Sequence, residues 1–174
     1  MNLLDTGKER NDPWHRPDAV LWDCDGVLID SEPLHYEAIR TVTAGRGVTL
    51  SPQENTALLG ASLPTVWQFL ARSGLAMPLG EWIAAIEDHY LSRLHPGLAR
   101  PEALAMILRL DAEQCPQARV STAERHIHRA NLDALGVLAA FRVIISREDV
   151  ARTKPDPDPY REACARLGAG TARP

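Results

Sequence analysis

The chain has 174 residues, of which 45% are hydrophobic and 24% charged, enough to bury one core or one core with a small appended domain. Its 19 basic and 23 acidic residues give a net charge of −4, which excludes the basic surface typical of proteins that bind nucleic acid or anionic membranes. The N-terminus has no signal-peptide pattern, and no window reaches the roughly 18 apolar residues of a membrane span. We therefore expect a cytoplasmic protein without nucleic-acid or membrane partners.

The first predicted strand follows a polar leader. Residues 1–17 carry two prolines and are expected to be flexible. Residues 19–22 form a short apolar run that predicts a buried parallel strand ending at Asp23. Asp25 and Gly26 then predict a compact turn.

Residues 33–95 have a different pattern. Apolar residues recur at helical spacing, as in Trp67, Leu70 and Ala71, and no segment has the alternation of a strand. Four prolines stand where helices would begin, at positions 33, 52, 64 and 78. The pattern predicts an all-helical insertion.

Helices and strands alternate from residue 96 onward. Alternation of this kind implies parallel βαβ units, so residues 18–32 and 96–174 are expected to form one α/β core with a Rossmann-like parallel sheet. The predicted helices span residues 101–110, 123–135 and 158–167, and the predicted strands span residues 118–120 and 141–145.

Two carboxylates stand at the end of the first predicted strand. Asp23 and Asp25 flank Cys24, and because side chains alternate along a strand, both carboxylates can face one crevice. Their mutual repulsion is relieved by a hard divalent cation such as Mg2+. Cys24 should point the other way, as a core thiol. An ordinary Asp-Gly turn is the alternative explanation of the short pattern.

The longer run, DCDGVLIDSEPLH at residues 23–35, resembles the first motif of the haloacid dehalogenase superfamily, in its branch that is similar to β-phosphoglucomutase and phosphoglycolate phosphatase. The resemblance implies that Asp23 attacks phosphorus and forms an aspartyl-phosphate. It also implies that Asp25 protonates the leaving oxygen and then activates water, and that Asp23 and Asp25 bind Mg2+.

Two further motifs match in the same order. Taken alone, Ser121 is a helix N-cap and Lys154 a solvated loop residue. The resemblance implies instead that Ser121 and the Thr122 N–H hold phosphate, while Lys154 pairs with both the nucleophile and the phosphate.

The helical insertion coincides with the cap of this branch, which would close over the site. Gly60 and Ser62 resemble its substrate-facing loop, although a helix end followed by a helix cap explains them equally well. Leu63 stands where the branch's sugar-phosphate mutases carry arginine, which favours a phosphatase. His35 faces the site by resemblance, but its spacing is also that of an exposed helix histidine. His126 and His128 lie two apart on a predicted helix and are expected at the surface.

In this family, a fourth motif on a further strand completes the Mg2+ site, and the resemblance ends before it. Without that strand, the strand bearing Asp23 would be an exposed edge, which a second copy of the chain could pair. We expect a Mg2+-dependent phosphatase of small phosphorylated metabolites. The alternatives are a phosphomutase with the same intermediate, or a truncated, non-catalytic remnant that acts as an interaction module.

Overall fold

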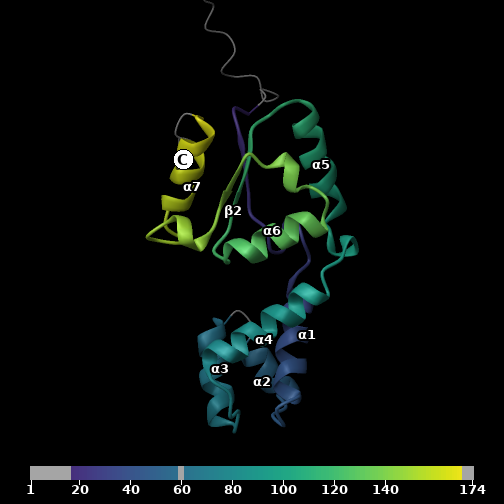
Figure 1. The fold of residues 1–174 in the computed structure, drawn as a ribbon, viewed down its shortest axis with the longest axis vertical. Helices are drawn as coiled ribbons and strands as arrows, with labels where there is room; N and C mark the ends of the chain where they lie inside the picture. Colours follow the sequence, from purple (N-terminus) through teal and green to yellow (C-terminus); the bar gives the residue numbers. More distant parts are fainter. Residues whose placement is uncertain (1–16, 59–60, 170–174) are drawn as a thin grey trace, which may run out of the picture.

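The computed structural model describes residues 17–58 and 61–169 (Figure 1). The predicted leader lies outside the described residues, apart from Pro17. Among the described residues, one parallel sheet contains β1 (Val20–Trp22), β2 (Gln117–Val120) and β3 (Val143–Ile145) in the order β1-β2-β3. This arrangement confirms the predicted α/β class with a Rossmann-like parallel sheet.

Helices cover both faces of the sheet. On one face, α5 (Pro101–Ala112) and α6 (Arg125–Ala134) contribute Ile107 and Leu132 to a core that also contains Cys24. On the other face, α7 (Asp158–Leu167) packs Ala163 against Ala118 and Val120 of β2. Helix α7 lies on the left in Figure 1. Both faces of the short strands are therefore covered, which explains the continuous apolar sequences of β1 and β3.

A separate helical group follows the first strand. Its helices are α1 (Glu32–Ala44), α2 (Pro52–Ala57), α3 (Leu63–Arg72) and α4 (Leu79–Ser92). They enclose their own core around Trp82, Leu70 and Ile86 and lie below the sheet in Figure 1. The boundaries between this group and the α/β core remain a proposal, with residues 33–95 as the inserted part.

Tyr90 joins the helical group to the α/β core. It packs with Leu34 of α1 and Ile127 of α6, and its hydroxyl donates to Asn131 Oδ1 at 2.9 Å. Tyr90 and Asn131 are almost fully buried, so this hydrogen bond lies in a water-poor contact. The contact fixes one end of α4 against α6.

Most element boundaries agree with the sequence prediction, and the deviations have local causes. The final helix has the predicted bounds, because Gly168 ends it with a left-handed backbone at φ 67°. Helix α6 begins at Arg125, two residues later than expected, since Glu124 keeps an extended backbone. Strand β3 begins at Val143 because a short 3-10 helix, Leu138–Ala140, precedes it.

Strand β1 lies at one edge of the described sheet. It pairs with β2 in a register that sets Leu21 opposite Ala118, and no other described strand pairs with it. The strand that carries Asp23 is therefore an edge, as the sequence analysis expected for the described part of the chain. None of the described helices combines the length and apolar character needed to cross a bilayer.

Ile107 and Leu108 give a matched test of this packing. They are neighbours on α5, yet Ile107 is 1% exposed and Leu108 is 52% exposed. We expect Ile107→Ala to lower the free energy of unfolding by about 2–5 kcal/mol, because it leaves a cavity in the core. Leu108→Ala should change it by less than about 0.5 kcal/mol. Urea unfolding measures both, and equal losses would contradict the packing described here.

Candidate active site

The loop after β1 presents both candidate carboxylates. The Cys24 carbonyl accepts the Leu28 N–H at 2.7 Å, and Gly26 takes φ 73°, so the chain turns back within a few residues. Asp23 Oδ1 accepts the Cys24 N–H at 2.7 Å. Asp25 Oδ1 accepts the hydroxyl of Ser31 at 2.6 Å. Both aspartates are exposed and have fixed orientations.

Lys154 connects this loop with the end of β2. Its Nζ lies 2.7 Å from Asp23 Oδ1 and donates to the Val120 carbonyl at 3.4 Å. The Lys154 side chain is 19% exposed, so the ion pair is partly shielded from water. Because Val120 immediately precedes Ser121, the contact brings three separate motifs of the sequence to one place.

Ser121 and Thr122 differ in their surroundings. Ser121 is buried, its N–H donates to the Ile145 carbonyl, and its Oγ accepts the Ala123 N–H at 3.3 Å. Ser121 is therefore not the N-cap of α6, a position that Glu124 occupies. Thr122 is exposed and lines a cavity, and no described acceptor takes its backbone N–H.

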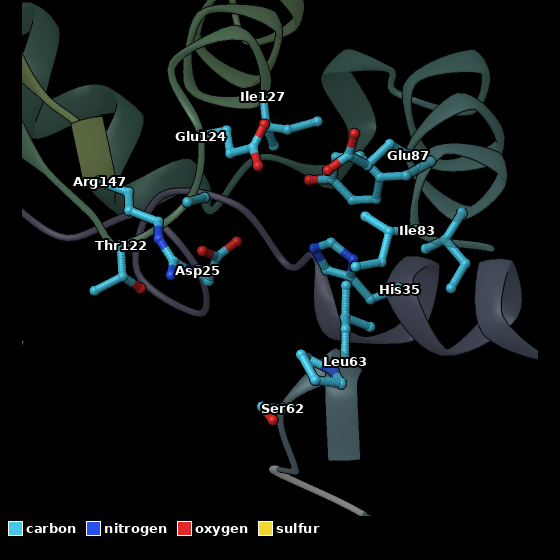
Figure 2. Close-up of a pocket in the computed structure, with 14 residues that line it drawn as sticks. Asp25, His35, Ser62, Leu63, Ile83, Glu87, Thr122, Glu124, Ile127 and Arg147 are labelled. Atoms are coloured by element: carbon cyan, nitrogen blue, oxygen red, sulfur yellow. The ribbon is translucent and has the colours of Figure 1, made fainter. Parts of the chain in front are cut away.

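The cavity has a volume of about 420 Å³ and lies between the α/β core and the helical group (Figure 2). Asp25, Thr122 and Arg147 line it from the core, whereas Leu63 and Ile83 line it from the helical group. A second cavity, of about 550 Å³, shares Asp25 and His35 with the first. Asp25 thus faces two partly open cavities of a size suited to a small molecule.

His35 is not an exposed helix histidine. Its ring is half-buried and stacks on Tyr90, with centroids 4.2 Å apart and planes inclined by 12°. Burial lowers the pKa of His35 from its usual value, while the nearby Asp25 carboxylate opposes the shift. The ring is therefore mainly neutral at pH 7 and can exchange hydrogen bonds with a ligand in either cavity.

Ser62 caps α3, since its Oγ accepts the Thr65 N–H at 3.4 Å, and it also lines the 420 Å³ cavity. Both explanations of Ser62, as a cap and as a cavity residue, are thus compatible. Gly60 lies outside the described residues.

Cys24 is fully buried, as expected of a core thiol, and its sulfur accepts from Asn131 Nδ2 at 3.7 Å. Burial raises the pKa of Cys24 to about 11, against the lowering effect of the Arg119 guanidinium. The thiol is therefore protonated at neutral pH and is no nucleophile.

The surface prediction is wrong for His128. Its side chain is fully buried, because α6 turns Ile127, His128, Asn131 and Leu132 inward. His126 is 51% exposed, as predicted. Burial, aided by nearby Arg119, lowers the pKa of His128 to about 4.

This shift makes stability depend on pH. In the unfolded chain His128 binds a proton near pH 6.5, but in the folded chain only near pH 4, so between these values protonation favours unfolding. We expect the free energy of unfolding to fall as the pH is lowered from about 6.5 to 4. His128→Gln should remove much of that fall, whereas the matched variant His126→Gln should retain it. Urea titrations at several pH values measure the slope, and equal slopes in the two variants would contradict this assignment.

Sequence reasoning missed several groups at this site. Glu87 and Arg147 line the 420 Å³ cavity, but their surroundings in the sequence resemble ordinary solvated positions. Arg119 is fully buried on β2, and its guanidinium nitrogens have no hydrogen-bond partner among the described residues. Its only sequence signal is a charge inside a short apolar strand.

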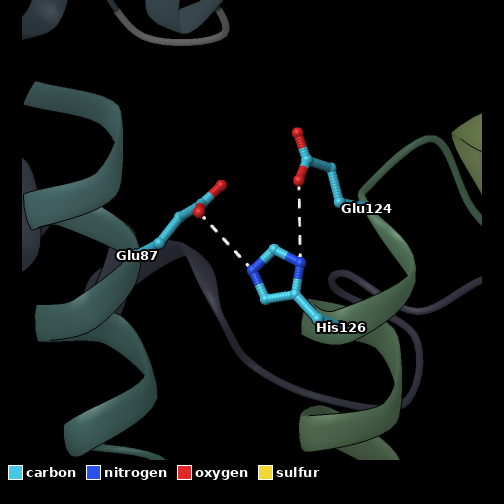
Figure 3. A group of neighbouring side chains, drawn as sticks. All are labelled: Glu87, Glu124 and His126. Carbon is cyan, nitrogen blue, oxygen red and sulfur yellow. Dashed lines mark ion pairs between the residues drawn. The ribbon is translucent and has the colours of Figure 1, made fainter. Parts of the chain in front are cut away.

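Two groups of side chains offer metal ligands. Asp23 and Asp25 supply carboxylates at the end of β1, and no described contact engages the Oδ2 atom of either residue. The second group contains Glu87, Glu124 and His126, whose ligand atoms lie within 4.8 Å of one another (Figure 3). Carboxylate oxygens alone suit Mg2+, whereas a histidine ligand suits transition metals.

The sequence is similar to proteins named as phosphatases along most of its length. It is 30% identical over 166 residues to N-acetylmuramic acid 6-phosphate phosphatase of Pseudomonas aeruginosa, covering 89% of this chain and 70% of that protein. It is 26% identical over 158 residues to validoxylamine A 7'-phosphate phosphatase of Streptomyces hygroscopicus, covering 86% of this chain and 70% of that protein. The chain thus spans about seven tenths of the length of these relatives.

A solved structure has the same fold. CbbY from Rhodobacter sphaeroides, in complex with phosphate, superposes with a TM-score of 0.72 at 24% identity, covering 88% of this chain and 74% of that chain. The family of haloacid dehalogenase-like hydrolases matches residues 17–173, nearly the whole chain. The chain therefore belongs to the haloacid dehalogenase-like hydrolases.

Proposed function

We propose that the protein is a Mg2+-dependent phosphatase of small phosphorylated metabolites that acts through an aspartyl-phosphate on Asp23. The contact between Lys154 Nζ and Asp23 Oδ1 carries the proposal. The Lys154 side chain is only 19% exposed, so its cation gives up part of its hydration to lie beside Asp23, and phosphoryl transfer needs a cation beside the nucleophile. Family membership and the phosphatase names of the relatives support the same reaction.

In the first step, a carboxylate oxygen of Asp23 forms a bond to phosphorus as the bond from phosphorus to the leaving oxygen breaks. Asp25 donates a proton to that leaving oxygen. In the second step, Asp25 takes a proton from a water molecule that attacks phosphorus. The bond from Asp23 to phosphorus then breaks, which releases phosphate and restores the carboxylate.

Asp25 suits this double role because of its position. It faces the 420 Å³ cavity, where a leaving group would lie, and its Oδ1 is oriented by the buried hydroxyl of Ser31. Ser31 precedes α1, so movement of the helical group relative to the core would be transmitted directly to Asp25.

The donor set fits Mg2+. Asp23 and Asp25 each keep one carboxylate oxygen without a described partner, and hard oxygen ligands are those that Mg2+ prefers. When bound, the ion neutralises charge on the phosphoryl oxygens. Lys154 contributes the remaining positive charge, and the unpaired Thr122 N–H can donate to a phosphoryl oxygen. The Ser121 hydroxyl accepts a hydrogen bond from the Ala123 N–H, and this bond would have to break before the hydroxyl could bind phosphate.

Hydrolysis is favoured over phosphomutase activity. Leu63, at the position where the branch's sugar-phosphate mutases carry arginine, lines the cavity with an apolar side chain. A mutase should isomerise hexose 1-phosphates, and we expect none of that activity. Cytoplasmic location and pairing of two copies along β1 stay predictions, and a hydrodynamic mass equal to the monomer would contradict the pairing.

Hydrolysis of p-nitrophenyl phosphate tests the proposed function. We expect turnover with Mg2+ and its loss in excess EDTA, with recovery when Mg2+ is added back. Absence of turnover in Mg2+, or equal turnover in EDTA, would refute the proposal. An inactive chain would instead support the non-catalytic alternative.

A further inference from the structure

The cavity beside Asp25 contains an acidic region whose purpose the proposed reaction does not explain. Glu87 comes from α4 and Glu124 from the start of α6, so the two carboxylates approach from opposite walls of the same cavity. Their side chains are 27% and 55% exposed. In Figure 2 both point into the space beside Ile127 and away from Thr122.

His126 lies between the two carboxylates and contacts both. Its Nε2 is 3.5 Å from Glu87 Oε2, and its Nδ1 is 3.6 Å from Glu124 Oε2 (Figure 3). The imidazole carries at most one positive charge, so beside two ionised carboxylates the cluster keeps a net negative charge whether or not His126 is protonated. Among the described residues, no lysine or arginine pairs with either glutamate.

The negative charge of Glu87 and Glu124 is therefore only partly balanced by neighbouring cations. Burial raises the pKa of Glu87, and the neighbouring Glu124 carboxylate raises it further, against the opposing effect of His126. The one arginine among the described residues of the cavity wall, Arg147, lies on the side of Thr122 in Figure 2. The cavity thus has positive charge near the reacting end and negative charge away from it.

We propose that this cavity selects phosphate monoesters whose leaving group carries a protonated amine, which binds between Glu87 and Glu124. The inference rests on the proposed function, because it assigns the leaving group of that reaction to this space. The rest of the wall fits a small ring or chain: Ile83, Ile86 and Leu63 supply apolar surface, and His35 supplies a hydrogen-bonding group. An ammonium group offers three donors and a positive charge, so it can bind both carboxylates and offset the negative charge that His126 leaves uncompensated.

A metal ion fits the same cluster less well. Each ring nitrogen of His126 faces a different carboxylate, so the imidazole is not oriented to share one ion with both glutamates. An amine makes no such demand on the imidazole, since it needs only the two carboxylates.

Glucosamine 6-phosphate and glucose 6-phosphate test the proposal, because they differ by an ammonium group in place of one hydroxyl. We expect kcat/KM to favour the amine substrate by about tenfold at low salt. Glu87→Gln and Glu124→Gln should each lower this ratio, and the double variant should bring it close to one. Glu102→Gln, on an exposed position of α5, serves as the matched control and should keep the ratio. Raising the salt concentration should also lower it, since the pairs are partly exposed.

The outcomes separate the two proposals. Equal kcat/KM for both sugars, or a ratio that survives in the double variant, would overturn the amine site while leaving the phosphatase intact. If no phosphoester is hydrolysed, the phosphatase proposal fails, and calorimetric titration of the same two sugars into the Asp23→Asn chain still tests the cavity. We then expect the amine sugar to bind more tightly than glucose 6-phosphate. This preference should be lost in the double variant and unchanged by added Zn2+. Equal binding, or a preference that appears only with Zn2+, would overturn the amine site.

Discussion

Replacing Asp23 with asparagine is expected to lower kcat for p-nitrophenyl phosphate by roughly 10⁴-fold or more, since the amide oxygen is a poor nucleophile. The substitution also removes the negative charge that pairs with Lys154 Nζ. Asparagine keeps an oxygen that can accept the Cys24 N–H, and the position is 45% exposed, so the fold should persist. Steady-state kinetics and thermal unfolding of the variant measure the two effects separately.

Asp30→Asn is the matched control for this variant. Asp30 belongs to the same loop, is exposed, and pairs with Arg100 at 3.4 Å, away from Lys154. Its loss should change kcat by less than about twofold, because an exposed ion pair contributes little. If Asp23→Asn retained activity, or if both variants lost it equally, Asp23 would not be the nucleophile.

Replacing Lys154 with methionine is expected to lower kcat by about 10²- to 10³-fold, the usual effect of removing one preorganised electrostatic contact at a transition state. Methionine keeps the length of the side chain but removes both the 2.7 Å pair with Asp23 and the hydrogen bond to the Val120 carbonyl. Kinetics at saturating substrate measure the loss.

Arg152→Met tests whether loop charge alone accounts for the effect. Arg152 is 65% exposed and pairs with Asp156 and Asp158. Its positive charge is therefore neutralised by nearby carboxylates rather than placed beside Asp23. We expect activity close to that of the native chain. A loss as large as that of Lys154→Met would mean that the loop, and not the ammonium beside Asp23, is what the reaction needs.

The sequence alone was sufficient to predict the helices and strands whose signals come from residues close together in the chain. The short segments before Asp23 and Ser121 form strands as predicted, and the helix that ends at Gly168 has the predicted bounds, because these signals depend mainly on neighbouring residues. The meeting of Asp23 with Lys154 was predicted by resemblance, since separate motifs at strand ends meet at one edge of a parallel sheet.

Prediction from the sequence failed where the exposure of a side chain depends on which face of a helix packs against the core. His126 and His128 looked alike, yet one lies at the surface and the other is buried, because the orientation of α6 about its own axis depends on packing against the sheet. His35 is half-buried for a related reason, since its stacking partner Tyr90 lies 55 positions further along the chain. Glu87 and Glu124 come from elements distant in the sequence, so no local pattern could pair them.

The central claim, that Asp23 becomes phosphorylated, is tested most directly by trapping with beryllium fluoride. With Mg2+ present, ¹⁹F nuclear magnetic resonance of the native chain should detect a bound fluoroberyllate that disappears in EDTA and in Asp23→Asn. Absence of that signal, or its persistence in the Asp23→Asn chain, would contradict the account.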